Sequence, residues 1–209
     1  RVNANLPAAY RQSLQLDGPN IKIVTSGKTS AILDYGRGNP VSYWIYALAA
    51  PFPTITDEIS AKTWQEFWQQ AADAPFSRLV MTAETLTAIK SRWGTPVGTV
   101  DVLDAQDLLL EAWKSENTWA VIPFEEIQPR WKIIAVNGQS PLHKDFSQIQ
   151  YPLAVPISLT ASQGVQSAAL ARELRPFLGQ SNRDPEKLVT VILSGVTAMV
   201  RATASAMDE

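Results

Sequence analysis

The sequence predicts an α/β layered fold, because stretches with the apolar pattern of strands alternate with stretches that have the pattern of helices. The clearest strand is residues 41–50 (VSYWIYALAA), a continuous apolar run that opens with β-branched and aromatic residues. Such a run is typical of a central strand that is buried on both faces. With 209 residues, of which 45% are hydrophobic, the chain can bury a core of good size.

In the first half of the chain, turn residues and capping patterns mark where elements begin and end. Thr63 and Glu66 form a capping-box pattern that predicts a helix starting at Trp64. Gly94 is expected to end the next helix. The expected elements are a helix at 6–16, a strand at 21–25, a strand or short helical turn at 31–35, the strand at 41–50, a helix at 64–72, a strand at 79–81 and a helix at 83–93.

The second half continues the alternation of strands and helices. Asp104 is placed to cap a helix that runs to about Trp113. Asn137–Gly138 predicts a tight turn after a strand. The expected strands are 100–103, 119–123, 131–136, 151–159 and 188–193, and the expected helices are 104–113, 163–178 and 196–207.

Composition argues against several classes of partner and site. The formal net charge of −2 and the lack of any Lys/Arg run give no electrostatic footprint for nucleic acid or anionic lipid. The chain has no cysteine, and its single histidine, His143, cannot build a multi-histidine metal site. We expect no metal and no cofactor. The acid pairs at 57–58 and 125–126 lie in loops and no nucleophile-elbow motif occurs, so catalysis is not expected.

Residues 26–30 (SGKTS) share their Gly-Lys-Thr with the phosphate-binding P-loop. Lys22 stands where that motif requires a glycine, so nucleotide binding is not supported. Two interpretations remain open. The hydroxyl and N–H groups of such a loop could bind an anion, or the segment is an ordinary solvated connection, which is the commoner case.

Thr82 to Thr85 lie where the helix at 83–93 is expected to begin. Free N–H groups and the helix dipole favour a carboxylate or phosphate at such a place. The alternative is plain capping by Thr82, with Glu84 or Thr85 in the first turn, and capping alone explains these residues.

Seven tryptophans could form a stacking surface for sugars or fill the core. Trp64 and Trp68 lie four residues apart on one helical face, and Trp44 shares a strand face with Tyr46. We expect core packing, because each ring buries a large area. The remaining tryptophans, each with apolar neighbours, are Trp93, Trp113, Trp119 and Trp131.

Several runs resemble the type 2 periplasmic solute-binding proteins of the phosphate-binding kind. The run from Tyr46 to Trp68 (YALAAPFPTITDEISAKTWQEFW) resembles the strand on which that family crosses between lobes. Residues 136–141 and 151–153 resemble its late turn and its Tyr-Pro-Leu return segment. The resemblance covers roughly residues 6–160. It implies mixed sheets flanked by helices in a reduced two-lobe form.

The same resemblance implies a non-enzymatic ligand site in a cleft between lobes. Polar groups from the loop at 26–30, the loop at 53–54 and the helix start at 82–85 would converge there, although Glu84 is unfavourable for an anion. The expected ligand is a small anion or polar solute. The ligand-binding residues implied are Ser26, Thr29, Ser30, Pro53, Thr54, Thr82, Glu84 and Thr85.

The whole chain also resembles bacterial proteins in which such a domain precedes a capsule or poly-gamma-glutamate synthesis domain. The runs that carry this resemblance are APFPT, WAVIPFE, PRWK and SGVTAMVRATA. It implies a solute-binding-like domain at 1–160, a helix and linker at 161–185, and the truncated opening of the synthesis domain at 186–209. In that opening, Val196 replaces the aspartate of the family's signature.

This second resemblance implies a sensory or accessory role in the cell envelope, periplasmic or extracellular, with the downstream synthesis domain as partner. Because Arg1 is not an initiator methionine, we expect that an upstream segment has been removed. Membrane association is expected only through parts outside this sequence. The alternatives are an interaction module without a ligand and, less favoured, a fragment of a capsule-synthesis enzyme.

Overall fold

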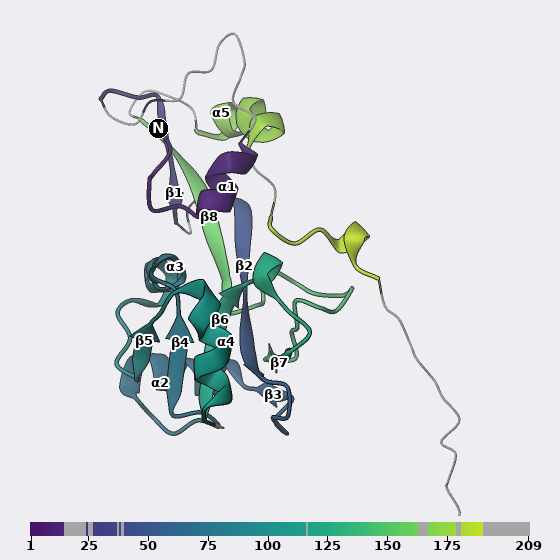
Figure 1. The fold of residues 1–209 in the computed structure, drawn as a ribbon. Helices are drawn as coiled ribbons and strands as arrows, with labels where there is room; N and C mark the ends of the chain where they lie inside the picture. The colour runs from purple at the N-terminus through teal and green to yellow at the C-terminus, as the bar shows by residue number, and fades with distance from the viewer. Residues whose placement is uncertain are drawn as a thin grey trace, which may run out of the picture.

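The computed structural model describes residues 1–14, 24, 27–36, 38, 40–115, 117–162, 167–178 and 181–189, which form a mixed sheet flanked by helices (Figure 1). The expected fold class is confirmed. The helices are α1 (Ala8–Ser13), α2 (Ala61–Gln70), α3 (Ala83–Trp93), α4 (Ala105–Trp113) and α5 (Ser167–Leu174), with 3-10 turns η1 (Phe124–Glu126), η2 (Arg175–Phe177) and η3 (Pro185–Lys187). The strands are β1 (Ala31–Tyr35), β2 (Pro40–Pro51), β3 (Glu58–Ile59), β4 (Arg78–Met81), β5 (Val100–Val102), β6 (Thr118–Pro123), β7 (Trp131–Val136) and β8 (Ala154–Ala161).

The long strand β2 joins two parts of the molecule. Its first half, residues 40–45, pairs antiparallel with β8, and its second half, residues 46–51, pairs with β6 and β7. Strand β8 pairs in turn with β1. We call α1, α5, β1, β8 and the first half of β2 the upper part, and β3 to β7, α2 to α4 and the second half of β2 the lower part, as they lie in Figure 1.

Strand directions in the lower part decide which loops share an edge. Strand β4 runs parallel to both β5 and β6, so Met81 and Pro123, which end β4 and β6, lie at the same edge. Strand β2 runs antiparallel to β6 and therefore ends, at Pro51, at the opposite edge. Helix α4 covers one face of this sheet and α2 the other (Figure 1).

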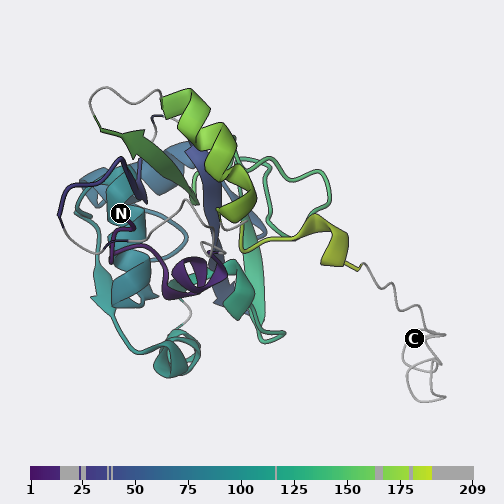
Figure 2. The ribbon, with the colours of Figure 1, turned by 90° about the horizontal axis from the view of Figure 1, so that it is seen from above.

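The upper part is smaller, and its buried apolar residues belong to a core cluster that continues into the lower part. Leu6 and Tyr10 are buried beside β2, and the Tyr10 ring meets Trp44 edge-on with 5.7 Å between ring centroids. Leu170 and Leu174 of α5 pack against the same core. The view from above shows the segment after α5 leaving the upper part toward one side (Figure 2).

Most tryptophans fill the core, as expected. Trp64, Trp68 and Trp119 are fully buried, and Trp44 and Trp131 are nearly so. Trp113 is the exception, because 47% of its surface is exposed on the outer side of α4. The prediction of core packing was wrong for this residue: α4 buries Leu108, Leu109 and Ala112 against the sheet, which turns Trp113 outward.

The ends of two helices differ from the expected ones. Helix α2 begins at Ala61 and not at Trp64, because the Ser60 hydroxyl caps it by accepting a hydrogen bond from the Thr63 N–H at 2.9 Å. The expected capping box of Thr63 and Glu66 was therefore wrong. Helix α1 begins only at Ala8, since the backbone of Pro7 is extended.

Other expectations are confirmed or lie outside the described residues. Helix α3 ends before Gly94, and the Asn137–Gly138 turn has positive φ angles of 55° and 71°. Of the strand expected at 21–25, only residue 24 is described, and residues 190–209 are not described. The helix expected at 163–178 is α5 followed by η2, with 163–166 outside the description.

Residues 181–184 bind to β2 and its neighbours at the point where β2 stops pairing with β8 and begins to pair with β6 and β7. The Asn182 side chain accepts a hydrogen bond from the Ile45 N–H at 2.8 Å and donates to the Ile45 carbonyl at 2.9 Å and to Glu125. Arg183 donates to the Pro141 carbonyl at 2.7 Å and lies over the Phe146 ring.

The expected division of the chain into domains at residues 160 and 185 remains a prediction. Among the helices that the structure describes, none combines the length and hydropathy needed to cross a bilayer.

Candidate ligand site between the two parts

The first turn of α3 faces the upper part. Thr82 caps this helix, since its hydroxyl accepts a hydrogen bond from the Thr85 N–H at 3.2 Å. Glu84 is exposed in the same turn, and its Oε1 accepts a hydrogen bond from the Ala8 N–H of α1 at 3.2 Å. Pro7, at the capping position of α1, offers no side-chain acceptor, so Glu84 supplies one from the lower part.

Two tyrosines and two further glutamates interact electrostatically with Glu84. Burial raises the pKa of Tyr35 and of Tyr46, and the Glu84 carboxylate raises the pKa of both further. Partial burial likewise raises the pKa of Glu125 and of Glu126, with Glu84 contributing to each shift. Among the described residues, no basic side chain forms an ion pair with any of these three glutamates.

This arrangement sets the electrostatics of the site. A small anion against the first N–H groups of α3 would gain from the helix dipole but would face the negative charge of Glu84, with weaker contributions from Glu125 and Glu126. Carboxylate oxygens accept hydrogen bonds, most strongly from charged donors. A polar solute that carries N–H or O–H donors therefore fits the site better than an anion does.

The raised pKa of Glu126 predicts a pH effect on stability. A carboxyl whose pKa is higher in the folded chain than in the unfolded chain favours folding while it is protonated, and this contribution is lost as the pH rises through the folded pKa. We expect wild type to lose stability relative to Glu126→Gln between about pH 4 and neutrality, by no more than about 1 kcal/mol because the side chain is exposed. Urea unfolding at several pH values measures this, and parallel profiles for the two proteins would contradict it.

The residues of the loop at 26–30 lie far from this site. Ser26 is outside the described residues. Thr29 and Ser30 precede β1, and the Thr29 hydroxyl accepts a hydrogen bond from the N-terminal amino group at 3.0 Å. Tyr35 ends this strand of 5 residues. A strand of that length spans about 16 Å, so Thr29 and Ser30 lie at the far end of the upper part.

Pro53 and Thr54 follow β2 at the edge of the lower sheet opposite to Thr82. They line a separate hollow of about 430 Å³, in which Trp113 is also exposed. The Thr54 carbonyl accepts a hydrogen bond from Lys132 Nζ at 2.6 Å. The local contacts of this loop are thus made within the lower part.

The structure does not bring the three expected segments together. The start of α3, with Thr82, Glu84 and Thr85, lies between the two parts, while the described residues of the other two segments lie at opposite ends of the molecule. The expected convergence in one cleft is therefore not found, because strand β2 and strand β4 end at opposite edges. Ligand binding by Thr29, Ser30, Pro53 or Thr54 remains a prediction.

Sequence reasoning missed four of the residues that do interact electrostatically with Glu84. Glu125 and Glu126 were expected in a loop, Tyr35 belongs to no motif, and Tyr46, which begins the run that resembles the crossing strand, was expected in the core. One signal could have found the glutamates: they follow β6 just as Thr82 follows β4, and parallel neighbouring strands end at one edge. Among the described residues, no group of three or more carboxylate or histidine side chains is arranged to hold a metal ion.

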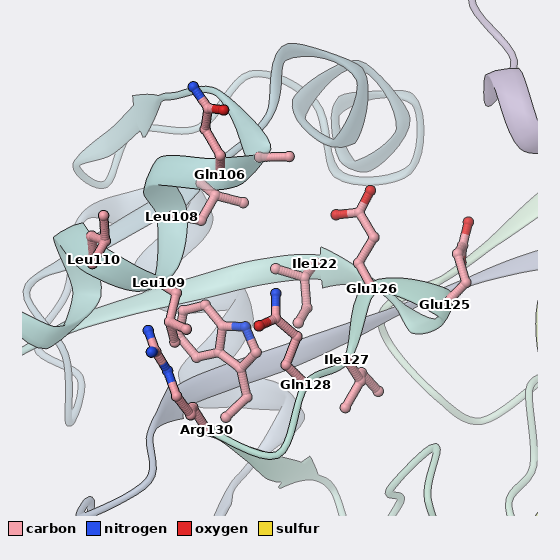
Figure 3. A pocket seen from close by; sticks show the side chains of 12 residues that line it. Gln106, Leu108, Leu109, Leu110, Ile122, Glu125, Glu126, Ile127, Gln128 and Arg130 are labelled. Atoms are coloured by element: carbon pink, nitrogen blue, oxygen red, sulfur yellow. The ribbon is translucent and has the colours of Figure 1, made fainter.

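A groove of about 610 Å³ lies beside this region, on the outer face of the lower part (Figure 3). Its floor contains Leu109, Ile122 and Trp131. Glu125 and Glu126 lie toward one end, and Arg130 lies toward the other. The groove is open, its floor is apolar, and it shares Glu125 and Glu126 with the region around the start of α3.

Neither a protein-family model nor a curated protein matches the sequence significantly. The structure has the fold of type 2 periplasmic binding proteins. It is similar to an ABC-type phosphate transport receptor from Vibrio cholerae, with a TM-score of 0.51, 11% sequence identity and coverage of 72% of this chain and 73% of that chain. At this identity, the similarity establishes the fold.

Two further solved structures share this similarity more distantly. PstS from Borrelia burgdorferi has a TM-score of 0.48 and 11% identity, covering 72% of this chain and 73% of that chain. A putative phosphate ABC transporter substrate-binding protein with bound phosphate from Clostridium perfringens has a TM-score of 0.46 and 10% identity, covering 71% of this chain and 72% of that chain.

Proposed function

We propose that this chain is an extracytoplasmic solute-binding-like domain that takes a small polar solute between its two parts. The observation that carries the proposal is the first turn of α3, which faces the upper part and exposes Glu84. The fold supports it, since a two-part α/β fold of this type has its natural ligand position between the parts.

The ligand chemistry follows from the charges. The similar structure from Vibrio cholerae is described as a phosphate transport receptor, which supports an anion as ligand. Glu84, with weaker contributions from Glu125 and Glu126, opposes an anion and favours a solute with hydrogen-bond donors, above all an ammonium group. Of the two expected kinds of ligand, we therefore propose the polar solute.

Ligand binding would also act on the contact between the two parts. The hydrogen bond from the Ala8 N–H to Glu84 joins them, and a solute that donates to Glu84 competes for the same carboxylate. The ligand therefore shifts the balance between arrangements of the two parts. In the cell envelope, this shift would report the solute to a neighbouring capsule or poly-gamma-glutamate synthesis domain, a partner supported only by the resemblance of the sequence runs.

Calorimetry with the whole chain tests the proposal. The probes are inorganic phosphate, glutamate oligomers, small sugars and a short diamine. We expect the strongest binding from the diamine or another donor-rich solute, and Glu84→Gln to weaken that binding about tenfold through loss of a charge-assisted hydrogen bond.

Glu173→Gln is the matched control, because Glu173 is exposed on α5 and lies in the upper part. It should leave binding unchanged. Two results would overturn the proposed ligand class: phosphate as the best probe, or equal binding by wild type and Glu84→Gln. No heat from any probe would remove the receptor function itself.

A further inference from the structure

Helix α4 does not cover its face of the lower sheet completely. Leu108, Leu109 and Ala112 of this helix are buried in a small core cluster with residues of β2, β4, β6 and β7. Between α4 and the start of β7 the groove of about 610 Å³ remains open to solvent. The apolar floor there has no helix over it among the described residues.

The floor residues Leu109, Ile122 and Trp131 are largely buried, and the exposed apolar surface lies on α4 at the rim of this groove and beyond it. Leu110 is 57% exposed and Trp113 is 47% exposed. Leu110 lines both the groove and a neighbouring hollow, which also contains Trp113 and Leu103. A small molecule would fill the groove alone, whereas a surface that extends along the whole helix is typical of a protein contact.

The two ends of the groove carry opposite charges. Glu125 and Glu126 lie toward the end where α4 begins, and Arg130 lies toward the end where α4 finishes (Figure 3). None of these three side chains forms an ion pair with another described residue. An α-helix has a partial positive charge at its N-terminus and a partial negative charge at its C-terminus, which matches this polarity.

We propose that this groove docks an amphipathic α-helix of a partner protein, apolar on one face, with basic residues toward its N-terminal end and acidic residues toward its C-terminal end. Its apolar face would pack mainly on Leu110, which is 57% exposed, and on the small parts of Leu109 and Trp131 that stay open to the groove. The helix would lie beside α4 at the usual distance of about 8–10 Å between helix axes and would complete the helix layer on this face. This is the helix-in-groove mode of recognition.

A second copy of this chain is a poor occupant of the groove. Its exposed helix, α4, has Asp107 in the first turn and Lys114 at the C-terminal end. If that helix docked in the proposed direction, Asp107 would lie beside Glu125 and Glu126, and Lys114 would lie beside Arg130. Like charges would then meet at both ends, at a cost in binding free energy.

Two synthetic peptides of about 18 residues test the proposal, since shorter helices are marginal alone. Both have the same Leu/Ala face. One carries lysines in its first turn and glutamates in its last turn, and the other has these charges exchanged. With fluorescein-labelled peptides and the whole chain, we expect the first to bind about tenfold more tightly than the second, as measured by anisotropy.

Charge exchange in the protein should reverse this preference. The variant Glu126→Lys/Arg130→Glu leaves the hydrogen bond between Asn182 and Glu125 in place, so the fold should be retained, which circular dichroism checks. Leu110→Ser should weaken both peptides. Ile149→Ser, at a residue that is 74% exposed in another hollow, should weaken neither.

Three results would overturn the proposal. The first is no binding of either peptide at about 1 mM. The second is a preference that the charge-exchanged variant does not reverse. The third is self-association of the wild type in sedimentation that Leu110→Ser abolishes, which would assign the groove to a second copy.

Discussion

Replacing Trp64 with alanine is expected to lower the free energy of unfolding by about 3–5 kcal/mol, the usual cost of removing a buried aromatic ring. Trp64 is fully buried, and its ring stacks on Trp68 with 5.3 Å between centroids and meets Trp93 at 6.5 Å. These rings join α2 to α3 on one face of the lower sheet. Urea unfolding followed by far-ultraviolet circular dichroism measures the loss.

A pair of phenylalanine variants separates ring packing from hydrogen bonding. The indole N–H of Trp64 has no hydrogen-bond partner among the described residues, whereas that of Trp68 donates to the Gly94 carbonyl at 2.9 Å. Both substitutions remove the same atoms. We expect Trp68→Phe to cost about 1 kcal/mol more than Trp64→Phe. Equal costs of the two phenylalanine variants would contradict the contribution of the Trp68 hydrogen bond. A loss below about 1 kcal/mol for Trp64→Ala would show that this cluster is not the packing centre of the lower part.

Replacing Asn182 with alanine is expected to lower the free energy of unfolding by about 2–4 kcal/mol, because two backbone groups lose their partners. The N–H and carbonyl of Ile45 both bond to the Asn182 amide, and Ile45 is fully buried. Asn182 thus takes the place of a neighbouring strand where β2 passes from β8 to β6. Denaturant unfolding at neutral pH measures the effect.

Asn182→Asp tests the same contact electrostatically. Aspartate keeps an acceptor for the Ile45 N–H, but it loses both donors and places a second carboxylate against Glu125. We expect this variant to be at least as unstable as Asn182→Ala at neutral pH and to recover part of the loss near pH 4, where carboxylates become protonated. If the free energy of unfolding of Asn182→Ala lies within about 0.5 kcal/mol of that of wild type, the contact between Asn182 and Ile45 does not stabilise this part of β2.

The elements themselves were largely predictable from local sequence. The run at 41–50 is β2, the helix at 83–93 has the expected ends, and Asn137–Gly138 forms its turn. The start of α2 was misassigned, because Ser60 and Thr63 are both good caps and the pattern alone did not rank them. The exposure of Trp113 was missed, since apolar neighbours in sequence do not show which face of a helix meets the sheet.

The candidate site was predicted only in part. Helix α3 does begin at the expected place, with Glu84 exposed and Thr85 buried in its first turn, and ligand binding there remains a prediction. The hydrogen bond of Glu84 to Ala8 and its electrostatic interaction with Glu125 and Glu126 were not foreseen. Ala8 and Glu84 are 76 positions apart in the sequence, and no local pattern predicts a contact over such a separation.

The sequence by itself determined the class of fold, most of its described elements and the position of the helix start that bears Glu84. It did so because capping, turn geometry and apolar periodicity act over a few neighbouring residues. Only the tertiary structure decided which loops meet. That outcome depends on strand order and direction, which long-range packing sets: β4 and β6 end together beside the upper part, while β2 carries Thr54 to the opposite edge.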